Sequence, residues 1–270
     1  MDQAASVFGE REKAVFVEFA PELRGQAVRF PDDAVMFVIA NSLVNADKHD
    51  TAPENYNLRV VETTCAAEIL ARKLRLGGLT SRDGFGGTLQ EVVQRYYKGK
   101  DIPIEDQLQQ FQDVVKQVFA GDGEYTQSEL AELMDMDENQ LVEKYMTRFP
   151  GNLSSTSHLT KVRTTKFKLL ARTRHVLSEA RRVYLFRNLL SQSPSDSVDL
   201  YKQLGSLMNA SQDSCRDDFQ CSCPELDQLT QLARKYGAHG ARLTGLASPR
   251  MALICRRWVG RCYRCTDHKR

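Results

Sequence analysis

The sequence lacks any apolar run of 18 or more residues in its 270 positions, and a membrane-spanning helix requires about that length. Its first residues also lack the basic and then apolar segments that make up a secretory signal. Seven cysteines, an odd number in a chain of this length, are not typical of a disulfide framework. These absences predict a cytoplasmic protein with reduced thiols and no membrane partner.

A strong excess of charge is also missing, because 37 basic and 35 acidic residues leave a net charge of +2. Seven of the basic residues and only one acid lie in residues 246–270. The remaining 30 basic and 34 acidic residues make residues 1–245 mildly acidic. Nucleic-acid-binding domains carry a basic patch or stripe, so we predict no nucleic-acid partner.

No complete zinc motif is present. Cys221 and Cys223 have no second pair at zinc-finger spacing. Cys262, Cys265 and His268 form a lone triplet near an arginine-rich end, which is weak support for a metal. We therefore predict no metal site.

Residues 126–145 have the spacing of a helix-turn-helix, but their composition opposes DNA binding. Residues 122–143 contain eight acids and no lysine or arginine, which would repel phosphates. A calcium loop is also excluded, because Gln140 replaces the turn glycine and Met146 replaces the bidentate glutamate. A small acidic helical insert is the better interpretation.

The patterns that are present predict an α/β (α+β) fold. Short β-rich segments at residues 14–19 and 27–30 are followed by a continuous apolar run at 35–40, typical of a strand buried on both faces. Apolar residues at helical spacing then predict helices over residues 55–73, 89–97, 104–119, 165–190 and 195–208. The polar side of the fourth of these helices is predicted to carry Lys166, Lys168, Arg172, Arg174, Arg181 and Arg182, with His175 as a solvated residue among them.

A helix is also predicted at the very start, because a carboxylate at Asp2 would interact favourably with the free N–H groups of a helix terminus. The whole string Met-Asp-Gln-Ala-Ala-Ser-Val-Phe at residues 1–8 further resembles the catalytic segment of galactokinases, in the GHMP family of small-molecule kinases. Three later segments, at residues 55–62, 171–179 and 222–227, are similar to galactokinase segments in the same order, and the first of these is most similar to fungal sequences. The resemblance covers residues 1–245.

The resemblance implies a two-domain GHMP-type fold and transfer of a phosphoryl group from MgATP to the C1 hydroxyl of galactose. It makes Asp2 the base that accepts or orients the sugar hydroxyl proton, so Asp2 would also contact galactose. It makes Tyr56 an aromatic wall of the galactose site, although a half-buried aromatic at a helix start is the alternative. Gly245 would be a remnant of the glycine motif that approaches the nucleotide phosphates. The implied cofactors are ATP and Mg²⁺.

The chain departs from the family pattern at both ends. In the family, a sugar loop and a serine-rich phosphate loop precede the segment that resembles residues 1–8, so this chain resembles a kinase without those loops. After Gly245 the glycine-rich turn is replaced by Leu-Ala-Ser-Pro, and Pro249 is expected to end any strand. We expect residues 1–160 to be the remainder of the first domain with the acidic insert around 100–150, 161–245 to be part of the second, and 246–270 to be a disordered basic tail. The chain alone is expected to be inactive.

The residues leave other functions open. One is a galactose-sensing transcriptional regulator that binds sugar and ATP and then a repressor protein. Another is a folded remnant without activity. A sister kinase that acts on N-acetylgalactosamine is a third. The phosphate loop and the sugar loop that would separate these alternatives do not occur in the sequence.

Overall fold

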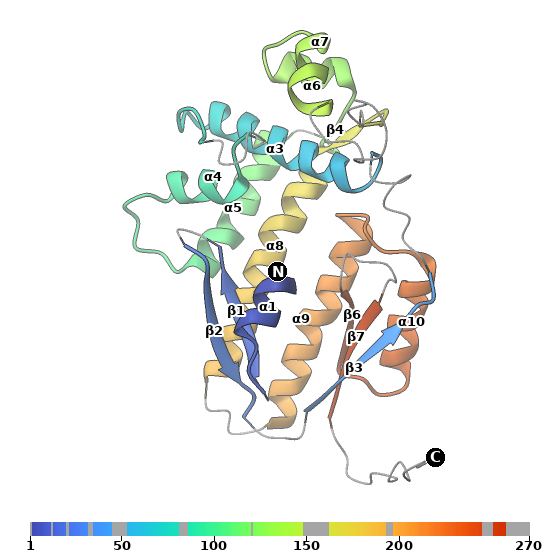
Figure 1. The fold of residues 1–270 in the computed structure, drawn as a ribbon. Coiled ribbons are helices and arrows are strands. Elements are labelled where there is room, and N and C mark those ends of the chain that lie inside the picture. The colour runs from blue at the N-terminus through green and yellow to red at the C-terminus, as the bar shows by residue number, and fades with distance from the viewer. Residues whose placement is uncertain are drawn as a thin grey trace.

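The computed structural model describes residues 2–11, 13–19, 22–31, 35–44, 53–80, 86–119, 121–147, 162–192, 197–244 and 251–257. They form the mixed helix-and-strand structure that the sequence predicts (Figure 1). The strands are β1 (Lys13–Glu18), β2 (Arg24–Arg29), β3 (Val35–Asn41), β4 (Glu124–Tyr125), β5 (Phe167–Lys168), β6 (Gly240–Thr244) and β7 (Met251–Arg257). The helices are α1 (Asp2–Phe8), α3 (Tyr56–Lys73), α4 (Leu89–Tyr96), α5 (Ile104–Val118), α6 (Gln127–Leu133), α7 (Glu138–Leu141), the π-helix η1 (Val142–Met146), α8 (Leu169–Ser191), α9 (Ser197–Asp217) and α10 (Pro224–Lys235).

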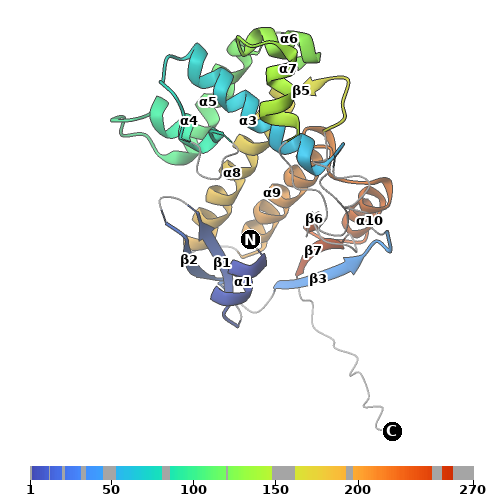
Figure 2. The same cartoon turned by 45° about the horizontal axis from the view of Figure 1, so that its top comes forward.

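The long helix α8 connects the two ends of the molecule, with α9 beside it (Figure 1). Neither glycine nor proline interrupts its 23 residues, which favours an unbroken helix. Its first half packs against α3 and α5, and its second half packs near β2 and α9. Figure 2 shows α3 lying across the end of α8 that bears the main core.

The main core lies between α3, α4, α5 and the first half of α8. The apolar stripe predicted for α3 is buried, with Val61, Cys65 and Ile69 at most 2% exposed. Phe111 of α5 and Leu177 of α8 complete the same cluster. The helices expected around residues 55–73, 89–97 and 104–119 are thus confirmed, since helical apolar spacing is a strong local signal.

The acidic insert is helical, as predicted, and rests on the main core. Thr126 and Asp137 each begin a helix with a capping box. In this motif the side chain of the cap residue accepts the backbone N–H of the third helical residue, whose own side chain accepts the backbone N–H of the cap residue. Leu130, Leu141 and Tyr145 turn inward and join the cluster that α3 lines. The insert therefore packs against the main core through apolar side chains, despite its acidic composition.

The prediction of a disordered tail is wrong for the seven residues of β7. This strand is the middle one of a three-stranded antiparallel sheet, in the order β3-β7-β6. Met251 pairs with both Asn41 and Thr244, so β7 forms main-chain hydrogen bonds on both edges. Such pairing depends little on an apolar pattern, and Pro249 precedes the strand and does not interrupt it. The other residues of the predicted tail lie outside the described ones.

The prediction that residues 35–40 form a strand buried on both faces is also wrong. The strand exists as β3, but it is an edge strand of this sheet. Phe37, Val38 and Ile39 are all exposed, and the exposed fraction of Ile39 is 64%. Periodicity cannot report whether another layer covers a strand.

The division predicted between residues 160 and 161 stays a prediction. The structure links its two sides, because α8 shares the main core with α3 and α5, β4 pairs with β5, and β7 pairs with β3. Among the described residues, no helix combines the length and the apolar character needed to cross a membrane.

Candidate functional site

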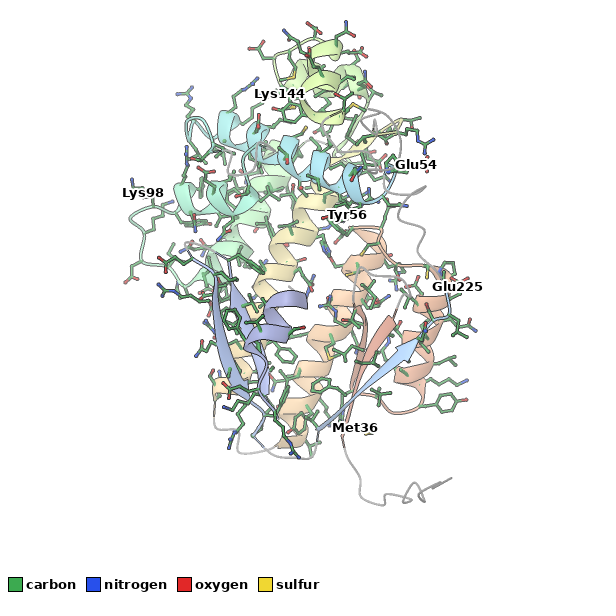
Figure 3. The ribbon with its side chains drawn as sticks, in the orientation of Figure 1. Met36, Glu54, Tyr56, Lys98, Lys144 and Glu225 are labelled. Atoms are coloured by element: carbon green, nitrogen blue, oxygen red, sulfur yellow. The ribbon has the colours of Figure 1, made fainter. Side chains whose placement is uncertain are left out.

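The predicted sugar-binding residue Tyr56 is the first residue of α3. The helix begins after Asn55, whose side chain makes no capping hydrogen bond. The Tyr56 side chain is 61% exposed and lies at the end of α3 nearest α9 (Figure 3). Tyr56 is thus more exposed than the alternative interpretation, a half-buried structural aromatic, expects. Its contact with galactose stays a prediction.

A buried carboxylate, Glu62, fixes the helix turns directly after Tyr56. Glu62 is fully buried. One oxygen accepts hydrogen bonds from Arg59 at 3.1 Å and from Arg172 at 2.7 Å, and the other accepts the backbone N–H of Lys168 at 2.8 Å. Because Arg172 belongs to α8, this cluster ties the start of α3 to the start of α8.

The two guanidinium groups extend the cluster to the segment that follows α9. Arg59 donates from Nε to the carbonyl of Phe219 at 2.6 Å, and Arg172 donates to the carbonyl of Asp218 and to the side chain of Gln220 at 2.8 Å. Burial lowers the pKa of Arg59, and the adjacent Glu62 opposes that shift. Carbonyl oxygens thus supplement the single carboxylate that faces two cations, as buried charges require.

His175 was predicted to be a solvated residue, and the structure corrects this. The ring is buried and stacks on Phe219 with centroids 4.3 Å apart. Its Nδ1 lies 2.9 Å from the hydroxyl of Ser214 on α9. Burial lowers the pKa of His175 to about 4, so the ring is neutral at pH 7.

Arg172 was likewise predicted on a polar face, yet it is only 1% exposed. Helix α8 is covered on several sides by α3, α5 and α9, so part of its charged side faces protein and not solvent. No local signal reports this burial, because the partner of Arg172 lies 110 residues earlier in the chain. The only sequence hint was the spacing of Arg59 and Glu62, which allows an ion pair within one helix.

A second polar cluster holds β6, the strand that ends just before Gly245. The Leu243 N–H donates to the side chain of Gln212 at 2.7 Å, and Arg242 donates to Glu179 of α8 at 2.7 Å. Burial pushes the pKa of Glu179 upward, but Arg242 and Arg182 outweigh it, so the pKa falls below its ordinary value. The strand is therefore anchored to α8 and α9. Gly245 itself lies outside the described residues.

The predicted helix start at Asp2 is confirmed, since α1 begins there. The side chain of Asp2 is outside the described part, so its role stays a prediction. Helix α1 packs against β1 and β2, whereas α3 packs against α4, α5 and α8. In Figure 1, α1 lies beside β1, in front of α8 and α9 and below α3.

The residues at the start of α10 make local structural contacts. Pro224 occupies the first turn, and Cys223 is the N-cap and makes no side-chain capping bond. Ser222 donates to Asp227 at 2.7 Å. Within the described ranges, no group of three or more histidine, cysteine or acidic residues is placed to hold a metal ion. We therefore assign no Mg²⁺ ligand to these residues.

One family model matches part of the chain, and a solved structure shares its fold. Residues 198–245, from α9 through β6 to Gly245, match the family described as GHMP kinases C terminal. A solved structure, the Lactococcus lactis galactokinase complexed with galactose, has a similar fold, with a TM-score of 0.55 and 20% identity over 94% of this chain and 45% of that one.

Curated relatives with a similar sequence are galactokinases. The chain is 35% identical over 263 residues to the galactokinase of Saccharomyces cerevisiae, covering 91% of this chain and 48% of the relative. It is 35% identical over 260 residues to that of Candida albicans, with the same coverage. It is 36% identical over 258 residues to that of Dictyostelium discoideum, covering 91% and 47%. The chain is similar to these galactokinases and spans about half of their length.

Proposed function

We propose that the protein represented by this chain is a galactose kinase that transfers the γ-phosphoryl group of MgATP to the C1 hydroxyl of galactose. The similarity to galactokinases over 91% of the chain carries this proposal. The accessible position of Tyr56 at the start of an anchored helix supports it. We further propose a cytoplasmic location, where MgATP and reduced thiols occur together.

In this proposal, Tyr56 places its aromatic face against the apolar side of the sugar ring. Such contacts are favourable because the ring supplies a large rigid surface with little loss of conformational freedom. The Glu62 cluster holds the first turns of α3 to α8 and to the Phe219 and Gln220 segment. The Tyr56 ring is thus attached to a helix whose position is already fixed, so sugar binding requires little further ordering of the protein.

Asp2 is proposed to accept or orient the proton of the reacting sugar hydroxyl. MgATP, when bound in the whole protein, supplies the phosphoryl group, and enzymes of this kind act mostly by positioning and charge stabilisation. The described residues offer no group that we can assign to the phosphates of MgATP or to Mg²⁺. We therefore propose that the chain alone does not turn over galactose.

The experiment compares the chain with a restored protein. Residues 1–245 replace the matching region of the Saccharomyces cerevisiae galactokinase, so that they are joined to the segments that flank this region in that protein. Formation of galactose 1-phosphate is then measured with MgATP. We expect turnover by the restored protein and none by the chain alone. Absence of turnover in a correctly folded restored protein would overturn the proposed function.

The same restored protein tests Asp2. Replacement Asp2→Asn keeps the size of the side chain but cannot accept a proton, so kcat is expected to fall by roughly 10²–10⁴. The affinity for galactose should change only a few-fold. A near-normal kcat would reduce Asp2 to a helix-capping role.

A further inference from the structure

A hollow of about 640 Å³ lies at the far end of α3 from Tyr56. Its walls come from the last turns of α3, the glycine-bearing segment after it, and the π-helix η1. Figure 3 shows Lys144, which lines the hollow, beside the helical insert and separated from Tyr56. The hollow is therefore distinct from the proposed sugar site.

Positive charge converges on this hollow. Arg72, Arg75 and Lys144 line it, against one carboxylate, Glu68. The carboxylate already accepts the hydroxyl hydrogen of Tyr145, and its oxygen lies 3.9 Å from the Lys144 amine. Among the described residues that line the hollow, cations therefore outnumber carboxylates by two, and Arg72 and Lys144 also line an adjoining hollow with Asp135 and Glu143.

Two of the three cations retain unused donors. Arg72 donates one N–H to the carbonyl of Met134 at 2.7 Å, which orients its guanidinium and leaves its other donors available. For the Arg75 side chain, the described part of the molecule provides no hydrogen bond and no ion pair. Guanidinium groups bind planar or tetrahedral oxyanions through paired donors, so both side chains suit a phosphate group.

The backbone around the hollow is unusual. Arg75 has a φ of +56°, a left-handed conformation in which glycine is favoured at a helix end. Arg95 donates to the carbonyls of Leu76 at 3.0 Å and Gly78 at 2.7 Å, so the segment after α3 is held in place. Lys144 lies on a π-helix, a rare element that is frequent at functional sites.

We propose that this hollow binds a small phosphate-bearing molecule. Arg72, Arg75 and Lys144 would contact the phosphate oxygens, and Gly77 and Gly78 allow the ligand to approach the backbone closely because they have no side chains. The volume falls within the range of small-molecule sites, about 300–1,000 Å³. It exceeds what a bare phosphate ion needs, so the ligand is an ester with an organic part.

The test is isothermal titration of the full chain at low ionic strength with three probes: inorganic phosphate, glycerol 3-phosphate and uncharged glycerol. We expect glycerol 3-phosphate to bind more tightly than inorganic phosphate, glycerol not to bind, and the phosphate affinities to fall as salt is added. Equal affinity for the first two probes would overturn the assignment of an ester ligand. The absence of binding by both phosphates would overturn the site.

Four variants locate the binding. Arg75→Asn removes the charge with a residue that tolerates left-handed backbone, and Lys144→Gln removes the second charge at an exposed position; each is expected to weaken binding roughly 5- to 30-fold. Glu68→Gln removes the carboxylate, so it should strengthen binding several-fold. Lys98→Gln is the matched control, because Lys98 is exposed and lies in the α4–α5 connection away from the hollow (Figure 3).

The opposite signs make the test decisive. Weakening by Arg75→Asn and Lys144→Gln, strengthening by Glu68→Gln and no effect of Lys98→Gln support the site. Equal effects of Lys98→Gln and Lys144→Gln would mean non-specific attraction to surface charge and would overturn it. Weaker binding by Glu68→Gln, with an unchanged melting temperature, would also contradict the assigned charge balance.

Discussion

The main core around α3, α5 and α8 buries its apolar side chains, whereas the N-terminal segments from α1 to β3 leave many of theirs exposed. In the main core the apolar stripe of α3 is almost fully buried, and even the charged Glu62 and Arg172 are enclosed and paired. Between residues 7 and 43, large apolar side chains are exposed. They are Val7, Phe8, Phe19, Leu23, Phe37, Val38, Ile39 and Leu43.

The comparison shows that a local pattern predicts an element better than it predicts what covers that element. The stripe on α3 and the apolar run of β3 are equally clear in the sequence. The stripe of α3 is buried, whereas β3 contributes Val35 to a second core cluster and leaves Phe37, Val38 and Ile39 exposed. An exposed apolar group of this extent is typical of a surface that another polypeptide or a further layer covers.

Breaking the buried charge cluster should have the largest effect. Replacement Glu62→Gln keeps the volume but leaves Arg59 and Arg172 without their carboxylate, which should lower the free energy of unfolding by about 3–5 kcal/mol. Chemical denaturation measures it. The control is Asp113→Asn, in an exposed pair with Lys116, which should cost less than about 1 kcal/mol. Similar losses of unfolding free energy in the two variants would show that the Glu62 cluster stabilises the fold no more than an exposed ion pair does.

The next pair of variants compares one residue type in the two regions. Ile69→Ala in the main core should lower the free energy of unfolding by about 2–5 kcal/mol, because it removes buried methyl groups and leaves a cavity. Ile39→Ala on β3 should cost less than about 1 kcal/mol, close to the span of strand propensity. Ile39 is 64% exposed and Ile69 is 2% exposed. If Ile39→Ala were as costly as Ile69→Ala, β3 would be covered and the contrast between the regions would fail.

A smaller effect concerns pH and the buried ring of His175. Its pKa of about 4 in the folded state lies below its ordinary value of 6.5, so the unfolded chain binds the proton more readily. Stability should be unaffected above pH 6.5 and should fall as the pH drops toward 4, by up to about 3 kcal/mol.

The control is His175→Gln, which removes the titrating group. The difference in unfolding free energy between the natural chain and this variant should shrink as the pH falls from 7 to 4. A difference that does not change with pH would mean that the ring is protonated or accessible in the folded protein.

The sequence predicted much of the fold because its helices carry their own signals. Val61, Cys65 and Ile69 recur at helical spacing, and capping residues such as Thr126 mark helix starts. The pairing of β3 with β7 could not be predicted, since more than 200 residues separate the strands and no local rule selects the partner. The candidate site divided in the same way. Tyr56 was predicted from its segment and stays a prediction, whereas the burial of Arg172 and His175 was missed because it depends on distant residues.

The most direct test of the account is galactose binding by the restored protein. Tyr56→Ala is compared with Tyr236→Ala, because both tyrosines are exposed, at 61% and 69%, and Tyr236 is the C-cap residue of α10. Isothermal titration should show that Tyr56→Ala weakens galactose binding by about 1–3 kcal/mol, the range for a lost aromatic contact, and that Tyr236→Ala leaves it unchanged. Unchanged affinity in the Tyr56→Ala protein would contradict the claim that the start of α3 forms the sugar site.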